Sequence, residues 1–306
     1  MVNFAAWWQI LKQTISEWSD DEAPRLGAAL AYYTVFSLAP LLIIVIAIAG
    51  RVFDPADVQR ELNTQFKNLM GPEGQQAITS MIAAAQKPKS GLIATVIGVV
   101  ALLFGATGLF VELKSALNTI WQVRLKPGRG FWGMIRDYYL SFALVVGIGF
   151  LLLVMLVISA ALAAVLAWFQ ARVPLPAFTA YGVEFLVSFI VVTLLFALIF
   201  MVLPDVEIAW RDVWLGAVFT SLLFNLGKFL IGLYIGQASF GSSYGAAGTI
   251  LVVLVWSYYS AQILLLGAEF TQVYAKRSGT EIRPNKNAES TAPAAPPAAK
   301  GRAAVN

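Results

Sequence analysis

The sequence contains neither cysteine nor histidine. Without cysteine, the chain has no disulfide, no thiolate metal site and no cysteine nucleophile. Without histidine, it has no imidazole general base, no Ser-His-Asp triad and no histidine-ligated metal centre. No nucleotide-binding fingerprint is present either. We therefore expect no metal site and no cofactor, and the familiar classes of histidine- and cysteine-dependent enzyme are excluded.

Charged residues are also scarce, at 12% of the chain, against ~25% in an ordinary globular domain. Hydrophobic residues make up 59%, and the net charge is +4. This composition is typical of a protein embedded in lipid. The N-terminus lacks the basic segment and short apolar core of a cleavable signal peptide, so we expect the first apolar stretch to act as an uncleaved anchor.

That first apolar stretch, residues 26–50, contains no charged residue. A helix needs ~20 apolar residues to cross a bilayer, and Pro40 is tolerated there because neighbouring membrane helices satisfy the freed carbonyl. Five more stretches follow, at 91–111, 138–169, 185–203, 213–235 and 246–268. The predicted fold class is all-α: a polytopic membrane protein with six transmembrane helices in residues 26–275, between an N-terminal segment, 1–25, and a C-terminal tail, 276–306.

Three segments outside the predicted spans have patterns of their own. Residues 4–18 place apolar side chains on one helical face, which predicts an amphipathic helix in the membrane interface or, alternatively, one packed on the cytoplasmic end of the bundle. Residues 51–90 predict a small extracytoplasmic helical hairpin around a turn at Gly71. The tail from Arg277, rich in alanine and proline, predicts a disordered segment. The face of residues 4–18 consists of Phe4, Trp7, Trp8, Leu11, Ile15 and Trp18.

The orientation follows from the 21 lysine and arginine residues, most of which lie at the two termini and in the loops after the second and fourth spans. Basic residues accumulate on the cytoplasmic side of membrane proteins. We therefore predict a multi-pass protein of the bacterial inner membrane with both termini in the cytoplasm.

Lys228 is the one charged residue well inside a predicted span. Ser221 and Asn225 precede it on the same helical face. Because an ionisable group is expensive in lipid, such a residue is a functional candidate. Three interpretations stay open: a substrate site that lines a cavity, a structural ion pair with Glu184, or a lysine that extends to the interface.

Two further sets of residues are candidates. Tyr258, Gln262 and Glu269 share one face of the sixth predicted helix, where Glu269 is either functional or simply solvated near the cytoplasmic end. The basic loop 112–137 interleaves cations with aromatic rings, which favours contact with anionic lipid headgroups or plain cytoplasmic anchoring. The candidate headgroup contacts are Arg124, Lys126, Arg129, Trp132 and Arg136. The glycine-rich link 236–248 predicts a tight turn or, alternatively, a cradle for an anion.

Several stretches resemble a known family. AALAYYTVFSLAPLL, ALNTIWQV with the following RGFW, and YGAAG are similar to motifs of the YihY/BrkB membrane proteins, over roughly residues 20–275. The resemblance implies a bacterial inner-membrane protein. Members have been called serum-resistance virulence factors or ribonuclease BN, and one branch has been linked to export of lipopolysaccharide precursors. The resemblance brings no catalytic residues to this chain.

The expected function is transport or translocation of a lipid-like or anionic amphipathic substrate, with membrane lipids or a lipid-linked precursor as partner. The alternative is a non-transporting scaffold, assembly factor or virulence-associated factor. A ribonuclease is the least favoured reading, because histidine is absent and the acidic residues near the inner face are scattered. We therefore expect neither an enzyme nor a nucleic-acid partner.

Overall fold

The computed structural model describes residues 4–51, 54–86, 108–126, 177–237, 246–280 and 282–291. Three predicted segments lie outside these ranges: the third span, 138–169; most of the second span, 91–111; and most of the link 236–248. The predicted all-α membrane fold is confirmed in this coarse form. The number of six spans stays a prediction.

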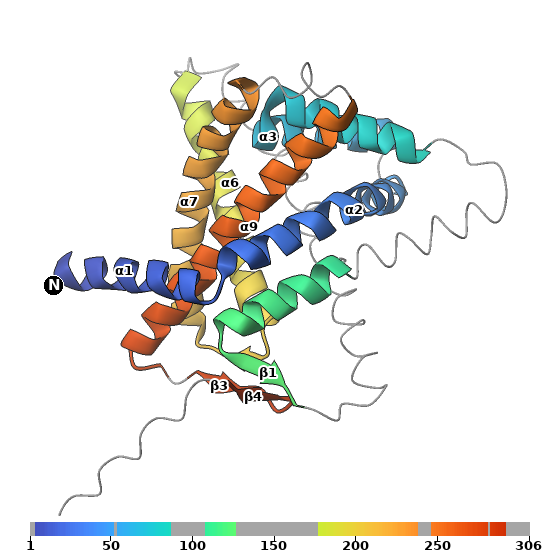
Figure 1. Ribbon diagram of the computed structural model, residues 1–306. Coiled ribbons are helices and arrows are strands. Elements are labelled where there is room, and N and C mark those ends of the chain that lie inside the picture. Colours follow the sequence, from blue (N-terminus) through green and yellow to red (C-terminus); the bar gives the residue numbers. More distant parts are fainter. Residues whose placement is uncertain are drawn as a thin grey trace, which may run out of the picture.

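The helices pack around α9, Ala246–Arg277 (Figure 1). It contacts α2, Ala23–Ala49, and α7, Trp210–Gln237, along much of its length. The helix α6, Ala177–Val202, lies against α7, and residues 108–120 form a further helix. Within the described residues, Trp210–Tyr234 and Ile250–Arg277 are long and apolar enough to cross a membrane, whereas Ser188–Val202 is apolar but shorter.

The helices α7 and α9 share a five-residue motif that brings them into close contact. Gly-Ala-x-Phe-Thr occurs at 216–220 in α7 and again at 267–271 in α9. A Cβ atom at Gly216 would lie 1.8 Å from Oγ1 of Thr271, and one at Gly267 would lie 2.0 Å from Oγ1 of Thr220. Small residues permit such close approach of backbones in membrane helices.

The contact between these two motifs is reciprocal. The Thr220 hydroxyl donates a 2.6 Å hydrogen bond to the Gly216 carbonyl, and the Thr271 hydroxyl donates an equal one to the Gly267 carbonyl. Each threonine thus satisfies its hydroxyl within its own helix while it packs on the glycine of the other. Beside these contacts, Phe219 of α7 stacks on Phe270 of α9, with ring centroids 3.9 Å apart. We call this arrangement the Gly/Thr seam.

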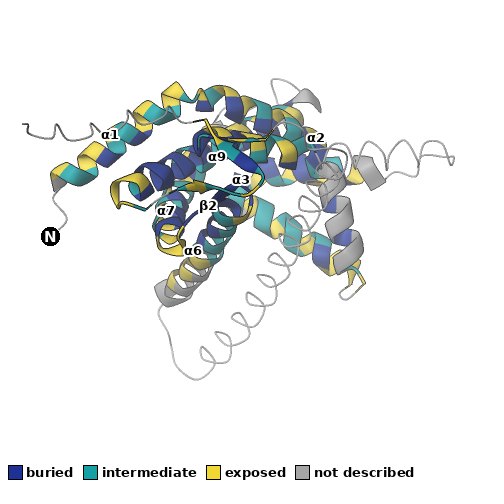
Figure 2. Ribbon diagram, turned by 90° about the horizontal axis from the view of Figure 1, so that it is seen from below, coloured by how far each residue is buried: buried dark blue, intermediate teal, exposed yellow. Residues whose placement is uncertain are grey.

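The buried residues lie on the sides of the helices that face one another, and the main core is formed by α2, α6, α7, α9 and helix 108–120 (Figure 2). Five large apolar side chains on the outer side of α7 are between 48% and 64% exposed. Because a soluble protein rarely exposes a large continuous apolar patch, this side fits contact with lipid tails. The five residues are Leu222, Leu226, Phe229, Leu230 and Leu233.

The N-terminal helix α1, Phe4–Asp20, packs against α9. Trp7 stacks on Phe270 and Tyr274, with centroids 6.2 and 6.1 Å apart. The predicted helix over residues 4–18 is confirmed. Of its apolar side chains, Trp7 packs on α9, whereas Trp8 and Ile15 are 53% and 60% exposed. The side of α1 that carries Trp7 therefore packs on the bundle. For the side that carries Trp8 and Ile15, a position in the membrane interface stays a prediction.

The helix α3, Pro55–Gln86, consists of two halves that meet at Gly71 (φ 77°). In the sequence, Asn63 and Thr79 are equally far from Gly71, and the Thr79 hydroxyl donates a 3.0 Å hydrogen bond to the Asn63 side chain. The two halves thus fold back on each other as a helical hairpin. In Figure 1 this hairpin lies at the opposite end of the bundle from the strands.

The C-terminal segment forms strands, so the expectation of disorder from Arg277 is wrong for residues 282–291. The strand β1, Val123–Leu125, pairs antiparallel with β4, Ala288–Ser290. The strand β2, Val206–Glu207, pairs antiparallel with β3, Arg283–Pro284. This segment therefore ties the loop after residue 120 to the loop between α6 and α7. We call residues 282–291 the C-terminal strap.

Candidate functional site

The predicted face of α7 forms a polar line between α6 and α7. Ser221 is fully buried, and its Oγ accepts a 2.9 Å hydrogen bond from the Thr193 hydroxyl of α6. Asn225 donates from Nδ2 to the Ser221 carbonyl at 2.9 Å, whereas its Oδ1 is buried and receives no hydrogen bond. Lys228, one turn further along, is half-buried and interacts with another group of the protein. The side chain of Glu184 lies outside the described residues.

The three residues predicted to share a face of α9 separate in the structure. Tyr258 is 37% exposed, on the outer side of the helix. Gln262 donates a 3.4 Å hydrogen bond to the Ala23 carbonyl at the start of α2, and Glu269 is fully buried. The structure therefore brings Gln262 and Glu269, but not Tyr258, to the contact between α2 and α9.

Glu269 meets a second carboxyl group there, that of Asp21. Asp21 lies in the turn between α1 and α2, and the two carboxyls are within hydrogen-bonding reach of each other. Both oxygens of Glu269 and Oδ2 of Asp21 are buried and receive no hydrogen bond from a donor group. Burial raises the pKa of Asp21, and the charges of Glu17 and Asp20 add to this rise, against the opposing effects of Glu269 and Lys276.

Other polar groups near this carboxyl pair are also incompletely satisfied. Gln272, one turn after Glu269, donates from Nε2 to the Ile120 carbonyl at 2.5 Å, but its Oε1 is buried without a donor. The indole N–H groups of Trp18 and Trp121 are buried without an acceptor. Since buried polar groups in proteins are nearly always paired, this part of the bundle is unusual.

Sequence reasoning missed Asp21. The stretch Ser19–Glu22 resembles a helix-capping box, which assigns its acidic residues to the start of the next helix. In the structure α1 extends to Asp20, and the carbonyl of Glu22 accepts hydrogen bonds from the amides of Arg25 and Leu26 at the start of α2. The signal that was available was the run of three acidic residues, Asp20–Glu22, a few residues before the uncharged stretch 26–50.

Asp205 is the centre of a second buried network, which is fully satisfied. Its carboxylate accepts hydrogen bonds from Asn118 at 2.9 Å and Asn285 at 2.8 Å, and it forms a 3.0 Å ion pair with Lys114. Burial by itself would raise the pKa of Asp205. The hydrogen bonds from Asn118, Lys114 and Asn285 and the charge of Lys114 outweigh that effect and hold this pKa below its usual range.

These contacts join three segments of the chain. The Asp205 amide also donates to Asn118 Oδ1 at 2.8 Å, and the Asn285 amide donates to the Asp205 carbonyl at 2.9 Å. Helix 108–120, the loop before β2 and the C-terminal strap therefore meet at one side chain. Because every atom has a partner, the network has the features of a structural junction rather than a ligand site.

The basic loop is described only in part. Arg124 forms a 2.8 Å ion pair with Glu289 of the strap, and its side chain stays 69% exposed. Lys126 donates a 3.2 Å hydrogen bond to the Lys286 carbonyl. Arg129, Trp132 and Arg136 lie outside the described residues. Contact of these five residues with lipid headgroups stays a prediction.

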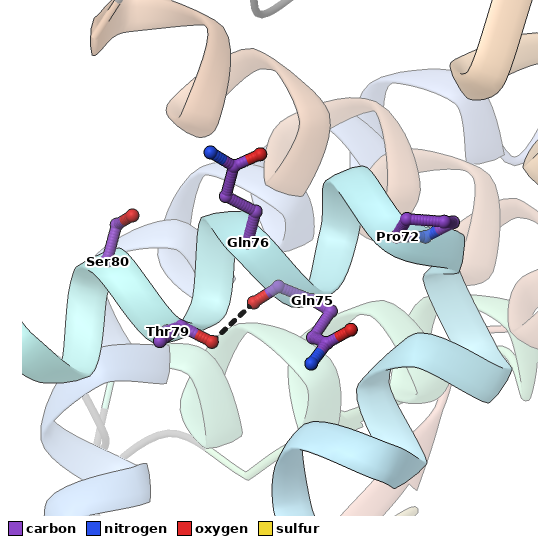
Figure 3. Close-up of a pocket in the computed structure, with 5 residues that line it drawn as sticks. All are labelled: Pro72, Gln75, Gln76, Thr79 and Ser80. Carbon is purple, nitrogen blue, oxygen red and sulfur yellow. Dashed lines mark hydrogen bonds between the residues drawn. The ribbon is translucent and has the colours of Figure 1, made fainter.

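A shallow pocket of about 320 Å³ lies on the second half of α3 (Figure 3). Its lining comes from a single helix, and the Thr79 hydroxyl also donates to the Gln75 carbonyl at 2.8 Å. None of the candidate residues lies in it. The lining residues are Pro72, Gln75, Gln76, Thr79 and Ser80.

Comparison with known proteins places the chain among membrane proteins. The family model for virulence factor BrkB matches residues 14–292. A UPF0761 membrane protein of Psychrobacter sp. (strain PRwf-1) is 25% identical over 287 residues, which are 91% of this chain and 50% of that protein. The similar protein of Ralstonia nicotianae is 27% identical over 256 residues, or 81% and 55% of the two chains.

A third relative extends this pattern. The UPF0761 membrane protein of Verminephrobacter eiseniae is 28% identical over 272 residues, which are 86% of this chain and 62% of that protein. The chain therefore spans about half to three-fifths of the length of these relatives. No solved structure matches the chain.

Proposed function

We propose, from the premise that this chain belongs to the virulence factor BrkB family of membrane proteins, that it translocates an anionic, lipid-like amphiphile. The substrate would move along the polar line of α6 and α7, with Lys228 as the counter-charge for its headgroup. The observation that carries this proposal is the Oδ1 atom of half-buried Asn225, which is itself buried and receives no hydrogen bond.

The argument rests on the cost of polar groups in lipid. Thr193, Ser221 and Asn225 bring polar atoms into a pair of strongly apolar helices, and Lys228 adds a charge beside them. Such groups are expensive in a bilayer and usually mark a substrate path. The exposed apolar side of α7 would let a lipid chain remain in the bilayer while its headgroup follows the polar line.

We further propose the topology that this function requires. The chain would span the inner membrane six times with both termini in the cytoplasm. The arrangement in Figure 1 supports this, because α1 and the strands lie away from the α3 hairpin along the bundle, as the distribution of basic residues predicts. Anionic headgroups would contact the basic loop and the exposed face of α1.

A scaffold without transport activity is the alternative proposal. The observation that favours it is the exposed face of α1, where Trp8 is 53% and Ile15 60% exposed with Lys12 placed over the Trp8 ring at 5.4 Å. An amphipathic helix with this composition can hold a protein at a membrane surface without moving any substrate. In either case we propose that the protein is not an enzyme and does not bind nucleic acid.

Lipid retention and lipid flipping test the main proposal. Native mass spectrometry of protein released from nanodiscs would compare wild type with Lys228→Ala, and Lys67→Ala on the exposed surface of α3 serves as the matched control. We expect wild type and the control to retain a defined anionic lipid, and Lys228→Ala to lose it. Liposomes with a fluorescent phosphatidylglycerol should then show flipping that is faster than in protein-free liposomes and is lost in Lys228→Ala.

The scaffold predicts a different result. All three proteins would carry the same bulk lipid mixture, and none would flip lipid faster than protein-free liposomes. That outcome would contradict translocation.

A further inference from the structure

We propose that Asp21 and Glu269 form a buried proton-binding site in which the two carboxyl groups share one proton. The ligand of this site is the proton itself. The site lies between α9 and the turn that joins α1 to α2, and its existence does not depend on the proposed function.

The fold brings these two groups together from distant parts of the chain. Asp21 lies in the turn after α1, and Glu269 lies eight residues before the end of α9. Glu269 is fully buried, and each of its oxygens lacks a hydrogen-bond donor, as does Oδ2 of Asp21. Gln272 is 1% exposed and presents a further acceptor without a donor on the same side of α9.

A shared proton resolves this arrangement. An ionised carboxylate can only accept hydrogen bonds, so two of them in contact cannot hydrogen-bond to each other. Their negative charges also repel, and the repulsion is strong in an environment of low dielectric constant. Two carboxylates that share a site therefore hold one proton between them more readily than either would alone. With one proton, the O–H of one carboxyl donates to the other, and the pair carries a single negative charge.

Among the residues that the structure describes, the charged groups around the pair do not neutralise its negative charge. From α1, Glu17 and Asp20 contribute negative charge, which favours retention of the proton. From α9, the positive charge of Lys276 favours loss of the proton. This lysine is exposed, however, and it donates a 3.2 Å hydrogen bond to Gln122. At the start of α2, Glu22 and Arg25 pair with each other at the surface. Burial also raises the pKa of Asp21, so burial and the charges of Glu17 and Asp20 both favour retention of the proton.

A metal ion fits this site less well than a proton. Among the described residues, no group of three or more acidic side chains is placed to hold a metal. Hard cations prefer six or more oxygen ligands with several carboxylates, whereas a proton requires only the two oxygens between which it lies.

Infrared spectroscopy of the full chain in nanodiscs tests the site without any substrate. A protonated carboxyl group gives a C=O stretching band that a carboxylate lacks and that shifts in D₂O. We expect wild type to show such a band at neutral pH and to lose it as the pH rises. The band should be lost in Glu269→Gln and in Asp21→Asn, and it should persist in Glu207→Gln, which alters an exposed acidic residue on β2.

Each other outcome would overturn the proposal. A wild-type spectrum without the band, or a band that survives in both variants, would mean that the pair holds no proton. Loss of the wild-type band on addition of Na⁺ at constant pH would mean that a cation replaces the proton. If Glu269→Gln is not recovered as folded protein, Asp21→Asn and the titration of wild type decide the question. A link between this proton and transport would rest on the proposed function, and failure of lipid flipping would leave the infrared result unchanged.

Discussion

Replacement of Asp205 by alanine should destabilise the protein more than any substitution of an exposed charge. The carboxylate accepts from two buried amide side chains and pairs with Lys114, whose side chain is only 18% exposed. Removal of one partner from a buried ion pair costs about 3–5 kcal/mol. Asn118 and Asn285 also lose their acceptor, so the upper half of that range is expected.

Two further variants divide this loss into its parts. Asp205→Asn keeps an oxygen acceptor but removes the charge, so it should cost about 1.5–3 kcal/mol, the value of one charge-assisted hydrogen bond. Glu289→Gln removes the partner of Arg124 in an exposed pair, where about 1 kcal/mol at most is expected. The comparison sets a buried ion pair, between helix 108–120 and the loop before β2, against an exposed ion pair between β1 and β4.

Thermal unfolding in one detergent, followed by tryptophan fluorescence, measures the difference. The pKa of Asp205 lies below its usual range in the folded state. Its stabilisation is therefore fully present above the pKa of the unfolded chain, near 4, and is lost as the pH falls through the lower folded value. The gap between wild type and Asp205→Asn should narrow in acid. Equal unfolding midpoints for Asp205→Ala and Glu289→Gln at neutral pH would refute the reasoning.

Three further results are expected. Truncation after Gly279 removes the strap and both of its strand pairings, so it should lower the thermal midpoint clearly, whereas truncation after Thr291 should leave it unchanged. Gly267→Ala places a Cβ atom against Thr220 and should cost about 1–3 kcal/mol, while Gly232→Ala, with open space around it, should be neutral or stabilising in the same unfolding assay. Because the folded pKa of Asp21 is raised, ionisation of this group opposes folding; Asp21→Asn should therefore gain stability relative to wild type as the pH rises above about 4.

The helices could be predicted because their signal is local. The uncharged stretch 26–50 lies almost entirely within α2, and 213–235 lies within α7. The turn of the α3 hairpin could also be predicted from the sequence, because glycine at position 71 permits the positive φ that the reversal of the chain requires. Hydrophobic runs and glycine are features of adjacent residues, so no knowledge of the tertiary fold is needed to interpret them.

The strap could not be predicted from the same patterns. Its strands have two and three residues, and their partners lie in loops far away in the sequence. Alternation over so few residues is not distinguishable from irregular chain. An alanine- and proline-rich tail lacks the apolar residues for a core of its own. Residues 282–291 are ordered by contacts with distant parts of the chain: the two strand pairings and the hydrogen bonds between Asn285 and Asp205.

The carboxyl pair was missed for a related reason. Glu269 was recognisable as a candidate, but its partner could only be found by folding α2 against α9. In α1 the sequence likewise did not show which apolar side chains α9 contacts: Ile10 is buried and Trp7 partly buried, whereas Trp8 stays exposed. Periodicity identifies the sides of a helix; the neighbouring helix determines which side is buried.

The Gly/Thr seam restricts where the bundle can move. Thr220 and Thr271 are fully buried, and every hydroxyl in the seam is satisfied within its own helix. Relative sliding of α7 and α9 would force each threonine against the backbone of the other helix, so the two helices act as one rigid pair. Among the unsatisfied polar atoms of this pair are those of Glu269, which meets Asp21 in the turn before α2, and Oδ1 of Asn225, one turn after Ser221, which bonds to α6. A conformational change would therefore occur at those two contacts, where it can exchange one set of hydrogen bonds for another, and the seam would move as a unit between them.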